Sequence, residues 1–192
     1  MQTKAATTRQ AILEMAVDVS SREGLEGLTI GRLAKELGMS KSGLFAHFGS
    51  KEDLQLATVE AAARRFLEAV ILPAQQEQEG SARLAAYCEG YLEYLERGVF
   101  AGGCFWAAAA AEFDDRPGLV REAVQAGVAG WLGELGHQAM LAGSEDPGGV
   151  AFEIYSLGLG ANACSRLLAD EGAFERARVA LAQRLSALTG GA

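Results

Sequence analysis

Apolar residues recur at helical spacing along most of this chain of 192 residues. In residues 12–19 and 30–37 they stand at positions i, i+3, i+4 and i+7, which places them on one face of a helix. Further segments with helical patterning lie at 51–72, 83–97, 117–141, 147–168 and 174–188. The alternation of apolar and polar residues that is typical of strands never extends beyond a few positions. The sequence therefore predicts an all-α protein.

A tight break separates two short helices expected at 29–37 and 40–48. Gly38 suits the sharp turn, and Thr29 and Ser40 are residue types that commonly cap helix N-termini. The buried side chains that would set the crossing angle are Leu33, Leu37, Leu44 and Phe48. Two amphipathic helices joined in this way are typical of a helix-turn-helix, whose second helix enters the major groove of DNA. We expect three N-terminal helices in such a domain, at residues 1–50, followed by a larger C-terminal helical bundle at 51–192.

The second helix of this pair has a face that is too polar and too small for a core. Small residues at its start let a helix approach base edges, where serine and histidine can donate or accept hydrogen bonds. Open helix N-termini favour phosphate, and lysines add charge contacts that position a protein on DNA. The residues expected to contact DNA are Thr29, Ser40, Lys41, Ser42, Gly43, Phe45, His47 and Lys51. A helical hairpin inside a bundle, with solvated lysines, is the alternative, and it fits the unpatterned residues 41–43 less well.

Charge is distributed unevenly between the two parts of the chain. Residues 1–51 hold seven Lys or Arg against five Asp or Glu, which gives +2, whereas residues 52–192 hold ten against twenty, which gives −10. The total of −8 would by itself argue against a nucleic-acid partner. A mildly basic N-terminal part on an acidic body is nevertheless what a DNA-binding domain needs if the body is to stay clear of phosphates.

Residues 9–60 resemble the N-terminal domain of TetR-family transcriptional regulators. The residues that carry the resemblance are Gly24, Thr29-Ile30-Gly31-Arg32-Leu33-Ala34, Leu37-Gly38-Met39-Ser40-Lys41, Leu44-Phe45-Ala46-His47-Phe48 and Ser50-Lys51. The resemblance implies a homodimeric repressor that binds a pseudo-palindromic double-stranded DNA operator and is released by a small-molecule effector. It also implies that the last two helices of the C-terminal bundle form the dimer.

The same resemblance assigns roles within the expected DNA contacts. It places Thr29 and Lys51 on phosphates, and Ser42, Gly43 and His47 at or near bases. One position departs from the family pattern, because Phe45 stands where the family usually has tyrosine. The hydroxyl contact of that tyrosine to a phosphate would then be absent here.

The C-terminal part carries an aromatic-rich set that suits an apolar pocket with a few polar groups. The candidate effector contacts are Phe100, Phe105, Trp106, Trp131, His137, Tyr155 and Asn162. For any single aromatic residue, ordinary core packing at helical spacing is the stronger alternative. The small-residue stretch 158–164, with Phe174, Leu181 and Leu188, is the candidate dimer surface, and the intrachain core is an equally good alternative.

No catalytic constellation is apparent in the sequence. There is no Ser/His/Asp arrangement, no glycine-rich phosphate loop after a strand, and no cluster of metal ligands, so we expect no enzyme, cofactor or metal site. The carboxylates of residues 112–115 are interpreted as a solvated helix end. The second functional class that we retain is a small-molecule-binding helical protein with weak or no DNA binding.

Three widely spaced cysteines, Cys88, Cys104 and Cys164, fit free thiols in a reducing compartment. Cys104 is expected to be buried and structural, with thiol sensing as a minor alternative. The longest uncharged stretch, at 98–111, is shorter than a membrane span requires, and the polar N-terminus lacks the apolar region of a signal peptide. We therefore expect no membrane association and a cytoplasmic location.

Overall fold

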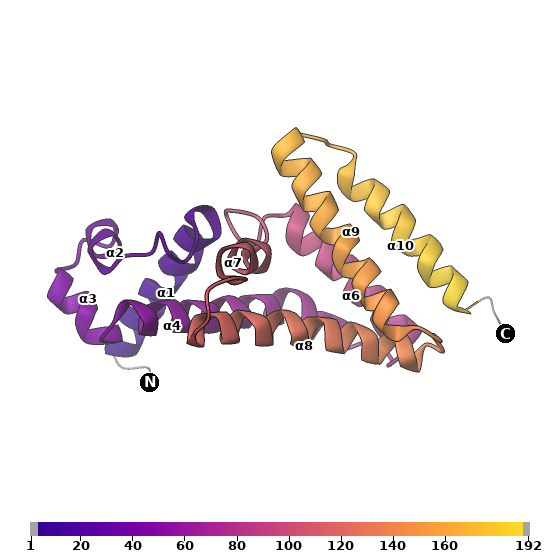
Figure 1. The fold of residues 1–192 in the computed structure, drawn as a ribbon, viewed down its shortest axis with the longest axis horizontal. Coiled ribbons are helices and arrows are strands. Elements are labelled where there is room, and N and C mark those ends of the chain that lie inside the picture. The colour runs from indigo at the N-terminus through magenta and orange to yellow at the C-terminus, as the bar shows by residue number, and fades with distance from the viewer. Residues whose placement is uncertain (1–3, 190–192) are drawn as a thin grey trace. The chain divides into compact units, whose positions relative to one another are not determined.

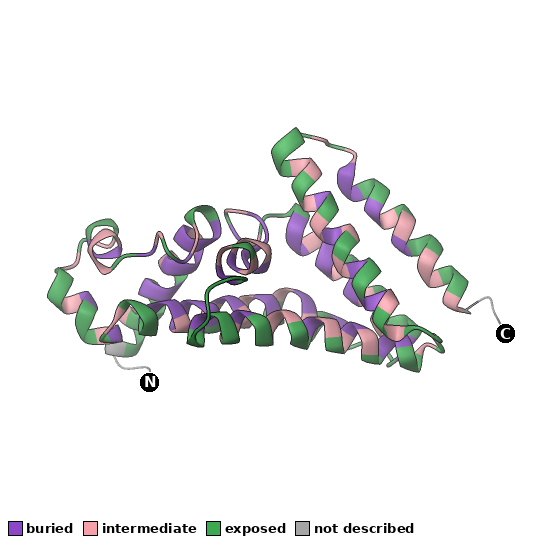
Figure 2. Ribbon diagram, viewed as in Figure 1, coloured by how far each residue is buried: buried purple, intermediate pink, exposed green. Residues whose placement is uncertain are grey.

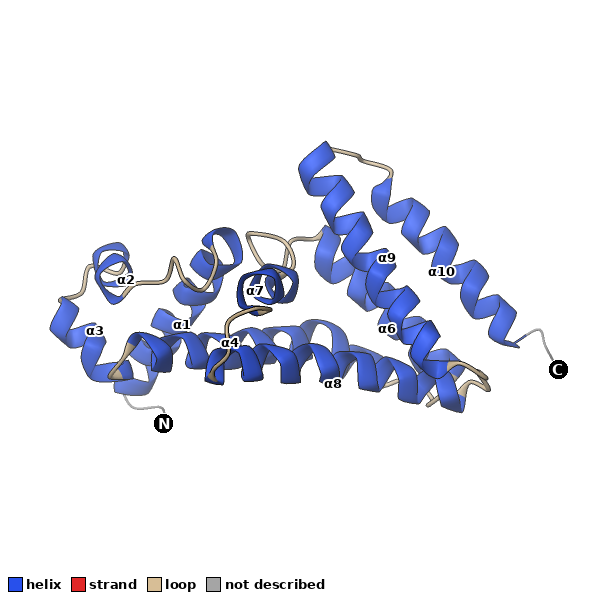
Figure 3. Cartoon of the chain, in the orientation of Figure 1, coloured by secondary structure: helices blue, strands red, loops and turns tan. Residues whose placement is uncertain are grey.

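The computed structural model describes residues 4–189. Their helices, shown in Figures 1 and 3, are α1 (Lys4–Glu23), α2 (Ile30–Glu36), α3 (Lys41–Phe48), α4 (Lys51–Phe66), the π-helix η1 (Leu67–Ile71), α5 (Leu72–Ala74), α6 (Ser81–Glu96), α7 (Phe105–Phe113), α8 (Leu119–Leu141), α9 (Pro147–Leu168) and α10 (Ala173–Thr189). Within these residues there is no strand. The prediction of an all-α fold with a helix-turn-helix ahead of a larger helical part is confirmed. None of the described helices is long and apolar enough to cross a membrane.

Packing divides the described residues into two compact units. The head unit comprises the residues up to Arg64 together with Phe100–Ala126. The body unit comprises Arg65–Val99 and the residues from Gly127 onward. The chain therefore passes between the units three times, within α4, in the loop after α6 and within α8.

The head unit has its core where α1, α2, α3 and the start of α4 meet. The fully buried side chains include Ile12, Leu33, Leu44 and Leu54, one from each of these helices. Figure 2 shows buried positions along much of α1, whereas most residues of α2 and α3 are intermediate or exposed. Burial of each such side chain contributes roughly 1.5–3 kcal/mol to folding, so these residues fix the crossing of α2 and α3.

The ends of the head helices are formed by local contacts that the sequence predicts. The side-chain oxygens of Thr29, Ser40 and Ser50 accept hydrogen bonds from the backbone N–H groups of the third residues that follow, at 3.2, 3.0 and 3.0 Å. Gly24 ends α1 with a φ of 81°, and Gly38 makes the α2–α3 turn with a φ of 63°. Both angles lie in the left-handed region that glycine adopts at low cost. The helix-turn-helix therefore has the caps and the turn that its sequence predicts.

The body unit is built from α6, α9 and α10 together with the end of α4 and most of α8. Helix α10 packs on α9 and α6. Gly158 of α9 lies against the ring of Tyr91 on α6, where a Cβ atom would come within 2.1 Å of a ring carbon. Part of the small-residue stretch 158–164 thus serves close intrachain packing. Cys88 of this unit is buried, and burial raises its pKa to about 12. Cys104, which lies in the head unit, is buried as well, as expected for a structural thiol.

Two details of the helices differ from the sequence prediction. The segment expected as one α-helix over 51–72 changes to a π-helix at Leu67–Ile71, ahead of Pro73. Pro117 stands before α8 and not within its first turn. The glycines spaced every third residue between 127 and 136 lie within α8, and Gly130 and Gly133 face open space.

Candidate functional site

Helix α3 exposes one face and buries the other. Leu44 and Phe48 are buried, whereas Lys41, Ser42 and Phe45 are exposed. Gly43 and His47 lie half-buried between them. The structure thus brings the predicted DNA contacts of α3 together on one surface.

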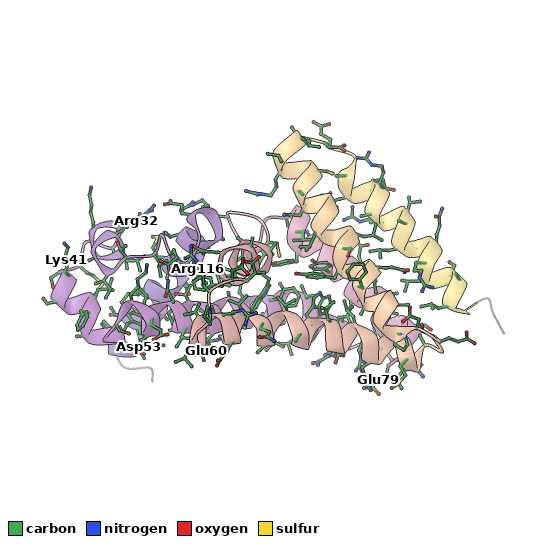
Figure 4. The ribbon with its side chains drawn as sticks, viewed as in Figure 1. Arg32, Lys41, Asp53, Glu60, Glu79 and Arg116 are labelled. Carbon is green, nitrogen blue, oxygen red and sulfur yellow. The ribbon has the colours of Figure 1, made fainter. Side chains whose placement is uncertain are left out.

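Lys41 is the cation on this surface. It stands at the start of α3 (Figure 4), and within the described residues it forms no ion pair. Its side chain passes over Gly31 of α2, where a Cβ atom would lie 3.0 Å from Lys41 Cε. An exposed ammonium group beside the N-termini of α2 and α3 is suited to phosphate.

Arg32, which projects from α2, is not a free cation. Its guanidinium group pairs with Glu23 and also with Glu36, whose Oε1 lies 3.0 Å from Arg32 Nε. These contacts raise the pKa of Arg32, and the hydrogen bond from Arg32 lowers the pKa of Glu23. Arg32 therefore joins α2 to the end of α1 within the head unit.

Lys51, an expected phosphate contact, forms hydrogen bonds within the head unit. Its Nζ donates to the carbonyl oxygen and to the carboxylate of Glu26, both at 2.9 Å. These hydrogen bonds lower the pKa of Glu26. Because nearly half of the Lys51 side chain remains exposed, a phosphate would share this ammonium group with Glu26.

The turn between α1 and α2 is held by a residue that the sequence interpretation missed. The backbone N–H groups of Leu25 and Glu26 donate to the Glu112 carboxylate of α7, at 2.6 and 2.9 Å. Glu112 was expected at a solvated helix end, and that interpretation is wrong for this residue. Glu112 follows Leu25 by 87 positions, so no local pattern could reveal the contact.

The candidate effector residues divide between the two units. Phe100, Phe105 and Trp106 lie together in the buried core of the head unit, with neighbouring ring centroids 5.6 Å apart. The body unit contains Trp131 and His137 on α8, and Tyr155 and Asn162 on α9. His137 is exposed, Tyr155 and Asn162 are half-buried, and Trp131 is buried.

Trp131 belongs to an aromatic cluster that was only partly foreseen. Its ring makes edge contacts with Phe66 and Tyr87, at centroid distances of 5.3 and 5.4 Å. The Tyr87 hydroxyl donates to Glu134 Oε1 at 2.9 Å, and burial with this contact raises the Tyr87 pKa. Within the described residues, Trp131 Nε1 and Asn162 Oδ1 are buried without a hydrogen-bond partner. The helical spacing of the tyrosines in residues 83–97 is apparent in the sequence, but their contact with Trp131 is not.

A shallow groove of about 600 Å³ runs between α9 and α10 in the body unit. Its lining is mostly apolar, with charged groups at its sides. The lining residues are Phe152, Glu153, Ser156, Leu157, Gly160, Ala161, Cys164, Ala173, Arg176, Ala177, Ala180 and Arg184. Phe152 is 66% exposed, which is unusual for an aromatic side chain in a described helix.

The fold and the α2–α3 geometry define a helix-turn-helix protein. Comparison with known families matches residues 12–58 to the bacterial regulatory proteins of the TetR family and residues 80–181 to the tetracycline repressor-like C-terminal domain. Because the second match alone spans more than half of the chain, the chain belongs to the TetR family of transcriptional regulators.

Individual relatives agree with this assignment. The transcriptional repressor AcnR of Corynebacterium glutamicum is 42% identical over 67 residues, which are 35% of this chain and 36% of AcnR. The match therefore spans about a third of that curated relative. The crystal structure of a TetR transcriptional regulator from Chloroflexus aurantiacus has a TM-score of 0.81 and 26% identity, covering 95% of this chain and 96% of that one. AibR, solved with isovaleryl coenzyme A and operator DNA, has a TM-score of 0.66 and 25% identity, covering 80% and 85%.

Proposed function

We propose that this protein is a repressor that binds a pseudo-palindromic operator as a homodimer and leaves it when a small molecule binds the C-terminal part. The observation that carries the proposal is the exposed face of α3, which combines Lys41, Ser42 and Phe45 beside two capped helix N-termini. Membership of a regulator family and the name of the AcnR repressor support it. In this proposal residues 1–50 bind DNA, and residues 51–192 bind the effector and form the dimer.

The proposed DNA contacts divide into positioning and reading groups. Thr29, Ser40, Lys41 and Lys51 hold phosphates, because they stand at helix N-termini or carry an ammonium group. Ser42, Gly43 and His47 approach base edges from the first turns of α3 or its exposed side. Phe45 packs an exposed ring against the sugar-phosphate backbone or a thymine methyl group.

The groove between α9 and α10 is the proposed dimer surface. A second copy of this groove would cover Phe152 and the open backbone at Gly160, which a monomer leaves exposed. The ion pair of Glu153 with Arg184 stands at the same surface. A two-fold interface pairs identical patches, so these four residues would meet their own copies or each other.

The proposed effector site lies in the body unit beside Trp131. The buried Trp131 Nε1 and Asn162 Oδ1 lack partners in the described residues, and an unpaired buried polar atom costs about 1–3 kcal/mol. An acceptor on a ligand would remove this cost at the indole, and a donor on a ligand would remove it at the amide. Trp131 and Asn162 then contact the effector directly. Tyr155, His137 and the head-unit aromatics Phe100, Phe105 and Trp106 remain further candidates from the sequence.

The test is a fluorescence-anisotropy titration against random duplexes and against DNA flanking the protein's own gene. We expect specific binding with two protomers per symmetric site. The logarithm of affinity should fall by about 0.9 per neutralised phosphate for each unit rise in the logarithm of salt concentration. An intact dimer that binds no duplex at low salt would refute the proposal and favour the ligand-binding protein without DNA binding.

A further inference from the structure

The α1–α2 turn offers a cradle for a carboxylate, and Glu112 occupies it. Two consecutive N–H groups, those of Leu25 and Glu26, point at the two carboxylate oxygens. They follow Gly24, whose φ of 81° is the left-handed conformation that turns successive N–H groups to one side. A Cβ atom at Gly24 would lie 2.7 Å from Glu112 Oε1, so the cradle has room for the carboxylate only because residue 24 is glycine.

The same turn also accepts hydrogen bonds from side chains of α4. Gln55 Nε2 donates to the carbonyl oxygen of Leu25 at 2.9 Å, and Lys51 Nζ donates to Glu26. Arg116, labelled beside α7 in Figure 4, lies 3.8 Å from the Glu26 carboxylate. The turn that leads into the helix-turn-helix thus has fixed partners on both α7 and α4.

A second contact brings α7 close to α1. The loop before α7 donates from Gly102 N to Ser21 Oγ at 2.9 Å. A Cβ atom at Gly102 would lie 1.8 Å from the Ser21 carbonyl oxygen, so the two backbones touch at a distance that only glycine permits. Helix α7 is therefore held against the end of α1 at Ser21 and against the following turn at Leu25 and Glu26.

From these contacts we propose that Glu112 is a positioning residue for DNA recognition, because its carboxylate fixes the direction in which α2 and α3 leave α1. The proposal rests on the proposed function and adds a part of the chain to it that lies outside the helix-turn-helix. Helix α7 follows α6 and precedes α8 in the chain, and both of those helices have residues in the body unit. A displacement of either helix on effector binding would therefore reach the reading helix through the Glu112 carboxylate.

The test compares Glu112→Gln with Asp115→Asn. Both substitutions remove one negative charge near the end of α7, but Asp115 is exposed and makes no contact with the turn in the described residues. Each protein is titrated with the duplex that the unmodified protein selects from a random pool and with a scrambled duplex. Amide hydrogen exchange at Leu25 and Glu26 is measured in parallel, and circular dichroism confirms folding.

We expect Glu112→Gln to bind the selected duplex about tenfold more weakly, since hydrogen bonds to a charged acceptor are lost. Binding to the scrambled duplex should change little, because it depends on phosphate neutralisation by exposed cations. Exchange at Leu25 and Glu26 should accelerate. Asp115→Asn should change both affinities by the same factor and leave the exchange unaltered.

In folded Glu112→Gln, the ratio of affinities for the selected and scrambled duplexes could equal that of the unmodified protein while amide exchange at Leu25 and Glu26 is faster. This result would overturn the proposal and leave Glu112 a purely structural residue. If Glu112→Gln does not fold, Glu112→Asp takes its place, because it keeps the charge and shortens the side chain. We expect it to lower the affinity for the selected duplex relative to the scrambled duplex in the same way. If the unmodified protein itself selects no duplex, the proposed function fails and this inference fails with it. If the unmodified protein selects a duplex and only the expected effect of the Glu112 variant is missing, this inference fails and the proposed function stands.

Discussion

At the scale of single residues, Phe45 is the side chain whose chemistry differs most from its neighbours on α3. Its ring is 51% exposed, although the same helix buries Leu44 and Phe48. An exposed ring gives up hydrophobic stabilisation that a buried position would provide. In the proposed function, contact with DNA covers this ring.

A tyrosine at this position should strengthen binding. Phe45→Tyr adds a hydroxyl group that can donate to a phosphate, and one such hydrogen bond is worth about 0.5–1.5 kcal/mol, or about twofold to tenfold in affinity. The comparison is made by anisotropy at constant salt. Phe45→Ala serves as the control and should weaken binding. Equal affinities for all three proteins would show that residue 45 does not touch DNA.

The residues that could be predicted from sequence are those whose partners are local. Thr29, Ser40 and Gly38 act within three or four positions of themselves, and their types alone indicate caps and turns. Lys51 and Glu112 make contacts across 25 and 87 positions, and no periodicity encodes such distances. The expected DNA face of α3 could be drawn from sequence, but the contacts that hold its supporting turn could not.

At the scale of elements, Gly24 and Gly38 make the two turns that enter and divide the helix-turn-helix. Both have left-handed φ values, but only Gly24 has a neighbour where a Cβ atom would be added, and Gly38 has none within 4 Å. We expect Gly38→Ala to lower the free energy of unfolding by about 1 kcal/mol, from backbone strain alone. Gly24→Ala should cost about 1 kcal/mol more, because it also displaces Glu112. Thermal and denaturant unfolding measure the free energy of unfolding of both variants. Equal decreases in the two variants would mean that the Glu112 carboxylate does not occupy the turn.

The carboxylates around this turn make its stability depend on pH. Hydrogen bonds from Arg32 and Lys51 lower the pKa values of Glu23 and Glu26 below their ordinary value of 4.5. A carboxyl group with a lowered pKa in the folded state stabilises the fold above its unfolded pKa and loses this contribution as the pH falls through the folded value. We expect the head unit to lose stability progressively below about pH 4.5, as far as these groups contribute.

The measurement is the unfolding temperature between about pH 6 and about pH 3 at constant ionic strength. Glu26→Gln should unfold at a lower temperature near neutral pH and show a shallower decline in acid. An identical pH dependence in the variant and the unmodified protein would remove Glu26 from this account.

Between elements, the limits of prediction were set by packing. The end of α4 kept helical spacing in sequence, yet the π-helix at Leu67–Ile71 adds a residue to one turn, which apolar periodicity does not record. The helix expected to begin at residue 117 begins two positions later, at Leu119. Helix boundaries of this kind depend on where backbone groups find partners, which composition alone does not determine.

At the scale of the whole molecule, the proposed dimer can be tested through Gly160. This residue lies on the exposed side of α9, has nothing within 4 Å of an added Cβ atom and lines the groove. Gly160→Glu should therefore leave the protomer folded while placing like charges against each other across a two-fold interface. We expect the dissociation constant of the dimer to rise at least about a hundredfold, which corresponds to about 2.7 kcal/mol.

Sedimentation measures the assembly state, and anisotropy with symmetric and half-site duplexes measures its effect on DNA binding. The control is Gly130→Glu on α8, which makes the same change at another exposed glycine with open space around it. The control should remain as associated as the unmodified protein. Loss of the dimer in both variants, or in neither, would place the interface elsewhere.

The hydrogen bonds between Glu112 and the α1–α2 turn can form only at a late stage of protein synthesis. Ribosomes add about 5–20 residues per second, so the 87 positions that separate Leu25 from Glu112 correspond to about 4–17 s of translation. During that interval the N-terminal helices exist without the carboxylate that completes them. A nascent chain that ends before residue 112 should therefore bind DNA poorly, even though every residue expected to touch DNA has already been made. The α1–α2 turn is therefore completed only after the chain has been synthesised as far as α7.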